Sequence, residues 1–127
     1  MMQYEGIHHV SLNVTDLAKA EAFYEEVLGL RRIERPPFDF AGTWYGVGDA
    51  GQQLHLIVKR AMPAGTSEIV TRDGHFAMRV ADWAATLEWL RQCGIEHKVN
   101  AASITGFAQI FLHDPDRNLI ELNAVIE

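Results

Sequence analysis

Three histidines and one glutamate occupy equivalent positions in two similar halves of the sequence. His9 and His75 are 66 positions apart, and His55 and Glu121 have the same separation. Imidazole nitrogens and carboxylate oxygens are the usual protein ligands of Zn, Fe, Mn and Ni. A single histidine on a strand is more often a surface or hydrogen-bonded residue, but four such groups at repeated positions predict a divalent-metal site.

The two halves are similar along most of their length. The segment "HHVSLNVTDLAKAEAFYEEVLG" aligns with "GHFAMRVADWAATLEWLRQCG", and "GDAGQQLHLIV" aligns with "HDPDRNLIELNAV". In both halves an alternating segment is followed by an aspartate (Asp16 or Asp82), an amphipathic segment and a glycine. Alternation predicts a strand, and an aspartate before an amphipathic segment predicts a helix N-cap. The chain is therefore predicted to contain an internal repeat.

Each half is predicted to form a strand, a helix and three further strands. The strands are expected at about residues 7–14, 30–35, 42–48 and 53–59 in the first half, and at about 74–81, 95–100, 107–113 and 118–125 in the second. The helices are expected at about 16–28 and 83–93, and segment 60–73 is expected to be a linker. The predicted fold is α+β, with two tandem βαβββ modules at about 5–60 and 73–127 in a single domain over residues 1–127.

Strand alternation also predicts which side chains share a face. The apolar residues of the strands, such as Leu12 and Leu56, are expected to pack against the helices. The four candidate ligands then lie on the opposite faces, which form a cleft if the modules curve around them. His8 precedes His9 and is expected on the helix side, making a structural hydrogen bond.

Composition narrows the classes of function. The chain has 127 residues, of which 48% are hydrophobic, and its formal charge is −6. It has no cluster of Lys and Arg, so nucleic acid and anionic membranes are not expected partners. We find no long apolar run and no signal-peptide pattern. The single cysteine, Cys93, cannot form an internal disulfide, and a cytoplasmic location is expected.

These motifs resemble the vicinal oxygen chelate (VOC) superfamily, which includes glyoxalase I, bleomycin resistance proteins, fosfomycin resistance enzymes and extradiol ring-cleavage dioxygenases. The similarity extends from "HHVSLNVTDLAKAEAFYEEVLGL" to "FLHDPDRNLIELN". It implies two βαβββ modules whose mixed sheets curve around a metal cleft. By position, His9, His75 and Glu121 match metal ligands of the family, and His55 matches a fourth. The resemblance further implies a divalent ion (Zn, Ni, Mn or Fe), a small-molecule substrate with vicinal oxygens, and a homodimer.

The resemblance favours a lyase or isomerase, in which the metal acts as a Lewis acid on two neighbouring substrate oxygens. Some members have Glu at the fourth ligand position, where it can serve as the base for proton transfer. His55 departs from that pattern, which argues against lactoylglutathione lyase activity itself. Because imidazole titrates near neutrality, His55 is either a ligand or the base. His55 and Glu121 are therefore the candidate catalytic residues.

Two alternatives remain open. Without His55 as a ligand, His9, His75 and Glu121 resemble the two-histidine, one-carboxylate triad of Fe(II) oxygenases. That set would indicate an extradiol ring-cleavage dioxygenase. The third interpretation is a metal-free protein that binds an aromatic molecule, as the bleomycin resistance members suggest.

Four residues are candidates for substrate binding. Arg79 shares a predicted face with His75 and could pair with a carboxylate or phosphate, although a surface salt bridge explains it equally well. Asn13 shares a predicted face with His9. Trp44 and Phe107 could line an apolar pocket. For these two aromatic residues, and for Phe38 and Phe40, packing in the core is the simpler interpretation.

Overall fold

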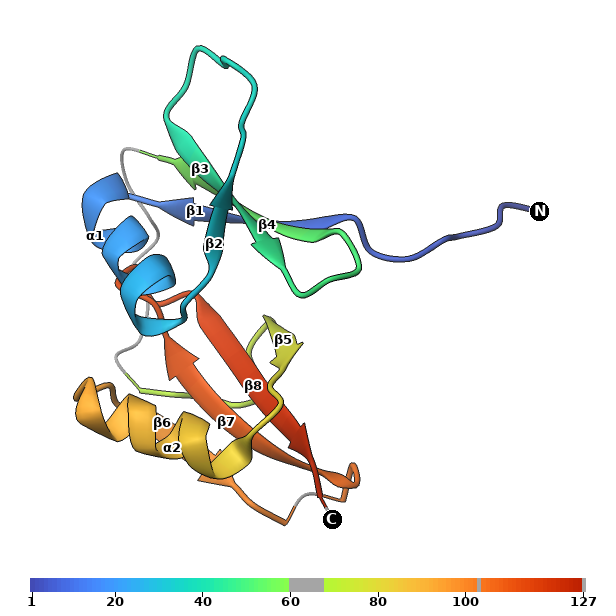
Figure 1. Cartoon of the computed structure of the whole chain (residues 1–127), viewed down its shortest axis with the longest axis vertical. Coiled ribbons are helices and arrows are strands. Elements are labelled where there is room, and N and C mark those ends of the chain that lie inside the picture. The colour runs from blue at the N-terminus through green and yellow to red at the C-terminus, as the bar shows by residue number, and fades with distance from the viewer. Residues whose placement is uncertain (60–67, 103, 127) are drawn as a thin grey trace. The chain divides into compact units, whose positions relative to one another are not determined.

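The structure of the protein is a computed structural model that describes residues 1–59, 68–102 and 104–126. The chain forms two compact units, Met1–Pro63 and Ala64–Glu127 (Figure 1). Each unit contains a four-stranded mixed sheet and a helical segment. The α+β class and the two βαβββ modules predicted from the repeat are therefore confirmed. Much of the predicted linker at 60–73 lies outside the described residues. Within the described ranges, no helix combines the length and apolar character that crossing a membrane requires.

The sheet of the first unit has the strand order β1-β4-β3-β2. Its strands are β1 (His9–Val14), β2 (Arg31–Ile33), β3 (Gly42–Val47) and β4 (Gln52–Val58). The β1-β4 pair is parallel, while β4-β3 and β3-β2 are antiparallel. Because β4 lies between β1 and β3, its middle residue, His55, has neighbours on both sides.

The second unit repeats this topology with the strand order β5-β8-β7-β6. Its strands are β5 (His75–Arg79), β6 (His97–Asn100), β7 (Phe107–His113) and β8 (Leu119–Val125). The β5-β8 pair is parallel and the other two pairs are antiparallel. Glu121 lies in the central strand β8, as His55 does in β4.

The register of the parallel pairs is also repeated. Ser11 pairs with His55 in the first unit, and Ala77 pairs with Glu121 in the second. His9 and His75 lie two residues before Ser11 and Ala77, and therefore on the same face as those residues. In each unit the backbone thus places a histidine of the edge strand beside a candidate ligand of the central strand.

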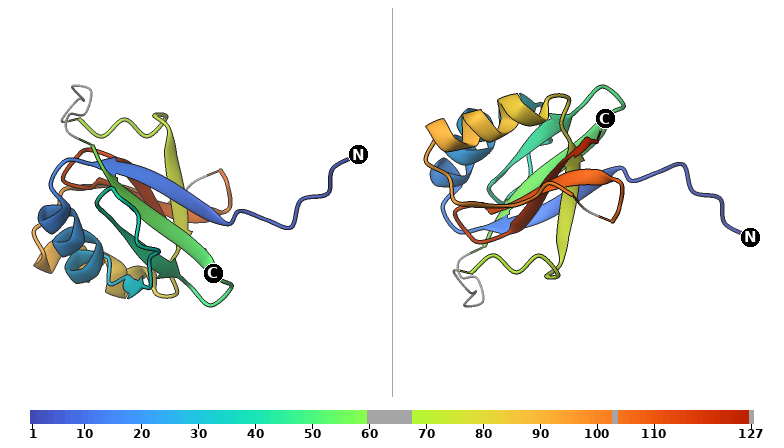
Figure 2. Two further views of the ribbon diagram at one scale, coloured as in Figure 1. Left: turned by 90° about the horizontal axis from the view of Figure 1, so that it is seen from above. Right: turned by 90° about the horizontal axis from the view of Figure 1, so that it is seen from below.

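Aspartate caps begin the helical segments, as predicted. The side chain of Asp16 accepts a hydrogen bond from the Lys19 backbone N–H, 3.1 Å away, at the start of α1 (Leu17–Ala22). Asp82 accepts one from the Ala85 N–H at 2.9 Å, before α2 (Trp83–Gln92). The views in Figures 1 and 2 show each helical segment on one side of its own sheet.

The first helix differs from the prediction of one continuous α-helix to about residue 28. It changes at Phe23 into the π-helical segment η1 (Phe23–Val27), in which the Leu28 N–H donates to the Phe23 carbonyl. The wider π turn accompanies the burial of two consecutive aromatic side chains, Phe23 and Tyr24. Buried aromatic area is a large stabilising contribution, and both rings enter the core from this π-helical segment.

Each unit buries apolar strand residues, including Leu56 as alternation predicted, whereas Leu12 is only half-buried. Fully or almost fully buried aliphatic residues include Val14, Leu54 and Leu56 in the first unit and Ile110, Leu112 and Ile120 in the second. In the first unit a polar cluster also joins the helical segment to the sheet. There the Tyr45 hydroxyl donates to Glu25 Oε2 at 2.8 Å, and Arg32 pairs with Glu21 and Glu25. Burial raises the pKa of Tyr45, so it remains a neutral donor.

Candidate metal-binding residues

In the first unit, His9 and His55 are in direct contact. Their rings are stacked, with centroids 4.2 Å apart and planes 17° from parallel. Trp44, which pairs with His55 across the β3-β4 ladder, stacks on the same imidazole at 3.9 Å and 3°. His55 therefore lies between an imidazole and an indole ring and is 6% exposed.

The protonation of His55 is set by this enclosure. Burial is the main cause that lowers its pKa from 6.5 to about 4, and electrostatic interactions with His9, His8 and Arg35 act in the same direction. Nε2 of His55 lies 2.8 Å from Oε1 of Gln53, to which its N–H donates. His55 is therefore a neutral imidazole at pH 7, the form that can bind a metal.

His8 does not point toward the helix as predicted. Strand β1 begins at His9, so strand alternation does not extend to His8. His8 is exposed, and its Nδ1 lies 2.8 Å from Nδ1 of His9. The expected hydrogen bond is present, but it is made to the neighbouring candidate ligand.

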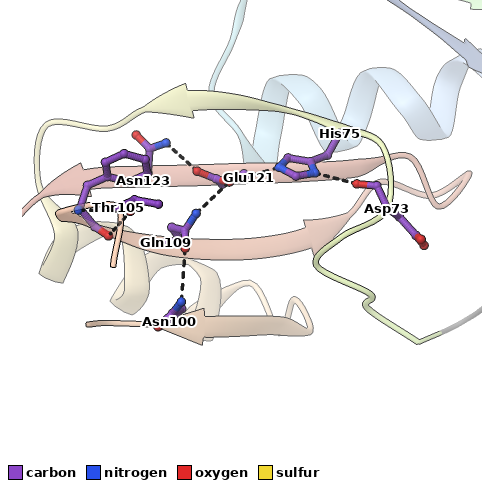
Figure 3. A network of polar contacts seen from close by, with 8 residues as sticks. Asp73, His75, Asn100, Thr105, Gln109, Glu121 and Asn123 are labelled. Atoms are coloured by element: carbon purple, nitrogen blue, oxygen red, sulfur yellow. Dashed lines mark hydrogen bonds and ion pairs between the residues drawn. The ribbon is translucent and has the colours of Figure 1, made fainter. Parts of the chain in front are cut away.

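In the second unit, His75 and Glu121 are brought together (Figure 3). Nδ1 of His75 lies 2.7 Å from the Asp73 carbonyl oxygen, which can only accept, so this nitrogen carries a proton. In the neutral imidazole Nε2 is then an acceptor, yet it faces Oε1 of Glu121 at 3.2 Å. Two acceptors at this distance repel each other unless a positive charge, from a proton on the imidazole or from a metal ion, is present.

Glu121 is almost completely buried and has further polar partners. Gln109 Nε2 donates to its Oε1 at 3.2 Å, and Asn123 Nδ2 donates to its Oε2 at 2.7 Å (Figure 3). The amide of Asn123 in turn accepts from Arg79 Nε at 2.6 Å. Such hydrogen bonds fix the orientation of a ligating carboxylate.

Gln109 was not identified from the sequence. It pairs with Asn123 across the β7-β8 ladder, and it is a polar residue between Phe107 and Phe111 on one face of β7. A polar residue between two phenylalanines on one face of a strand is the sequence signal that would have indicated Gln109.

The structure thus places the four candidate ligands in two pairs: His9 with His55 in the first unit, and His75 with Glu121 in the second. Among the described residues, no group of three or more His, Cys, Asp or Glu side chains is placed to hold a metal ion. A site that uses His9, His55, His75 and Glu121 together stays a prediction.

The candidate substrate-binding residues differ in their surroundings. Trp44 stacks on His55, whereas Arg79 lies 5.3 Å above the Phe107 ring and reaches Glu121 only through Asn123. Asn13 is half-buried on β1, on the face that carries His9.

Two further aromatic residues contradict the expectation of core packing. Phe38 and Phe40 are 45% and 43% exposed. They lie between β2 and β3, in a segment with no regular structure, so no sheet partner buries them.

Comparison with known proteins places this geometry in a family. Residues 6–122 match the Glyoxalase/Bleomycin resistance protein/Dioxygenase superfamily. The chain is 30% identical to a lactoylglutathione lyase of Escherichia coli, covering 90% of this chain and 88% of that protein. It is 31% identical to a probable lactoylglutathione lyase of Vibrio parahaemolyticus, covering 91% and 88%.

Solved structures agree with this assignment. A protein from Bacillus anthracis described as a glyoxalase family member matches with a TM-score of 0.82 and 26% identity, covering 99% of this chain and all of that one. A mutant of the fosfomycin resistance protein FosX from Listeria monocytogenes, complexed with Mn(II) and 1S,2S-dihydroxypropylphosphonic acid, matches with a TM-score of 0.76 and 20% identity, covering 98% and 95%. The chain therefore belongs to the Glyoxalase/Bleomycin resistance protein/Dioxygenase superfamily.

Proposed function

We propose that this chain is a divalent-metal-dependent, glyoxalase-like enzyme that acts as a lyase or isomerase on a small molecule with vicinal oxygens. His9, His55, His75 and Glu121 are the proposed metal ligands. The observation that carries the proposal is the His75–Glu121 pair, in which a histidine acceptor nitrogen faces a buried carboxylate. The lyase names of the relatives support the same class of reaction.

The donor set fits a divalent ion of the Zn, Ni, Mn or Fe type, since it offers three imidazoles and one carboxylate. The hydrogen bond from His75 Nδ1–H to the Asp73 carbonyl fixes the orientation of the ring. It leaves the lone pair of Nε2 available to bind a metal ion. Gln109 and Asn123 hold the carboxylate of Glu121 in place. A bound ion would supply Lewis-acid stabilisation of negative charge on substrate oxygens.

His55 and Glu121 are also the groups proposed to accept or hold the substrate proton. A pKa of about 4 makes His55 a weak base but keeps it neutral, which favours the role of ligand. Glu121 is then the stronger candidate for proton transfer. Asn13, Arg79, Trp44 and Phe107 are proposed to contact the substrate.

One observation favours extradiol ring-cleavage dioxygenase as a second candidate. His55 is stacked between His9 and Trp44, and its Nε2 is hydrogen-bonded to Gln53. If these contacts keep His55 away from the ion, two histidines and Glu121 remain, as in Fe(II) oxygenases. We propose in either case a cytoplasmic homodimer.

Metal content and titration test the proposal. The untagged protein, purified without chelator, is analysed for metals and then titrated with Zn, Ni, Mn and Fe(II). We expect about one ion per chain, and large losses of affinity in His9→Ala, His75→Ala and Glu121→Gln. His113→Ala is the matched control, because it removes a half-buried histidine at the end of β7 that is outside the set.

The outcomes separate the alternatives. An ion that is lost in all three ligand variants but kept in the control supports His9, His75 and Glu121 as ligands, and a further loss of affinity in His55→Ala supports the full set of four. An ion that depends only on His75 and Glu121 would restrict the site to the second unit. Cleavage of lactoylglutathione, or of a related 2-hydroxy thioester, to a thiol and a 2-oxoaldehyde would indicate a lyase, and oxygen consumption with a catechol and Fe(II) would indicate a dioxygenase. Failure to bind any of the metals would remove the enzyme proposal and leave a binding protein.

A further inference from the structure

We propose that Arg35, Phe38, Phe40 and Trp44 form a subsite in the first unit for a carboxylate attached to a flat apolar group. The inference deepens the proposed function, and it rests on that function for the role of the neighbouring His55. It assigns the substrate to a chemical class, the aromatic or similarly planar carboxylates.

The apolar part of this subsite is a continuous series of ring contacts. Phe40 stacks on Phe38 with centroids 5.0 Å apart, and Phe38 contacts Trp44 at 6.0 Å. Trp44 then stacks on His55 at 3.9 Å. Because Phe38 and Phe40 are nearly half-exposed, this series presents aromatic surface to solvent beside a candidate metal ligand. Such surface binds planar apolar groups by stacking.

The polar part of the subsite is the guanidinium of Arg35. Its Cζ lies 4.9 Å from the Phe38 centroid and 5.0 Å from that of Phe40, so both rings contact the cation. Nη2 donates to the Phe40 carbonyl at 2.7 Å, and Nε is buried without a hydrogen-bond partner. The remaining Nη hydrogens form an edge that matches the two oxygens of a carboxylate.

Arg35 differs from Arg32 and Arg91, which have negative partners. Arg32 pairs with Glu21 and Glu25, and Arg91 pairs with Glu88. Among the described residues no carboxylate pairs with Arg35, although the chain has 17 acidic and 11 basic residues. A half-buried cation without a counterion is costly, and an anionic ligand would offset that cost.

A matched pair of probes tests the proposal directly. 2-Naphthoate and 2-naphthamide have the same rings and differ in the charge of one group. We expect the full chain, treated with chelator, to bind the carboxylate at least about 10-fold more tightly than the amide, as for a charged hydrogen bond. The preference should disappear in Arg35→Gln and persist in Arg31→Gln, which removes an equal charge from an exposed position on β2.

Equal affinities of the unsubstituted protein for the two probes would overturn the proposal. A preference for naphthoate that survives in folded Arg35→Gln would also overturn it. If that variant does not fold, NMR of the natural chain decides. The Arg35 Nε–H signal should shift with naphthoate and not with naphthamide, and an unchanged signal refutes the subsite. Because these measurements use chelator-treated protein, their failure is distinguishable from failure of metal binding, which the metal titration reports separately.

Discussion

The stability of the metal-free protein should depend on pH through His55. The ring is buried against Trp44 and His9, and its pKa falls from 6.5 to about 4 on folding. Between these values the unfolded chain binds a proton at His55 and the native chain does not. The free energy of unfolding therefore decreases as the pH falls from about 6.5 to about 4.

The size of this effect follows from the two pKa values. One pKa unit corresponds to about 1.36 kcal/mol, so the complete shift corresponds to about 3 kcal/mol. His8 and His9 are exposed, and solvent screens their contribution. We therefore expect about 2 kcal/mol of the stability at pH 7 to be lost through His55 by pH 4.

Urea denaturation of the chelator-treated protein between pH 4 and pH 7.5 would measure this loss. In His55→Gln the amide can still donate to Gln53 but cannot titrate in this range. Between pH 7.5 and pH 4 the free energy of unfolding of this variant should therefore decrease by about 2 kcal/mol less than that of the unsubstituted protein. His113→Gln is the control and should follow the natural chain. If His55→Gln and the natural chain show the same pH dependence, the enclosure of His55 does not control its protonation.

Four other substitutions test the packing and hydrogen bonds of the two units. Gly42→Ala should destabilise the protein by about 2 kcal/mol or more, because its Cβ would lie 2.3 Å from a backbone oxygen of β4. In contrast, Gly46→Ala meets its nearest atom at 3.4 Å and should change the free energy of unfolding little, and urea denaturation compares the two. Asp82→Ala removes the N-cap of α2 and should cost about 1 kcal/mol, measured by the thermal midpoint. Tyr45→Phe removes the donor to Glu25 and should also cost about 1 kcal/mol in urea denaturation, and an unchanged midpoint would argue that this hydrogen bond is not formed in solution.

The sequence alone determined the architecture of each module. Alternation, aspartate caps and the constant offset of 66 positions between matched residues predicted the strand and helix order in both halves. It also placed His55 and Glu121 at equivalent positions, and the repeated register of the parallel strands confirms that equivalence. These features depend on local spacing, and a period of two or of 3.6 residues is visible in one dimension.

Only the tertiary structure decided what surrounds these residues. The stacking of Trp44 on His55 and the hydrogen bond from Gln109 to Glu121 join neighbouring strands whose pairing no local period specifies. The π turn at Phe23, where two neighbouring aromatic rings are buried, is likewise not indicated by the helical period of the sequence. Hydrogen bonds and pKa values depend on distances between side chains, and those distances are fixed only when the sheet has formed.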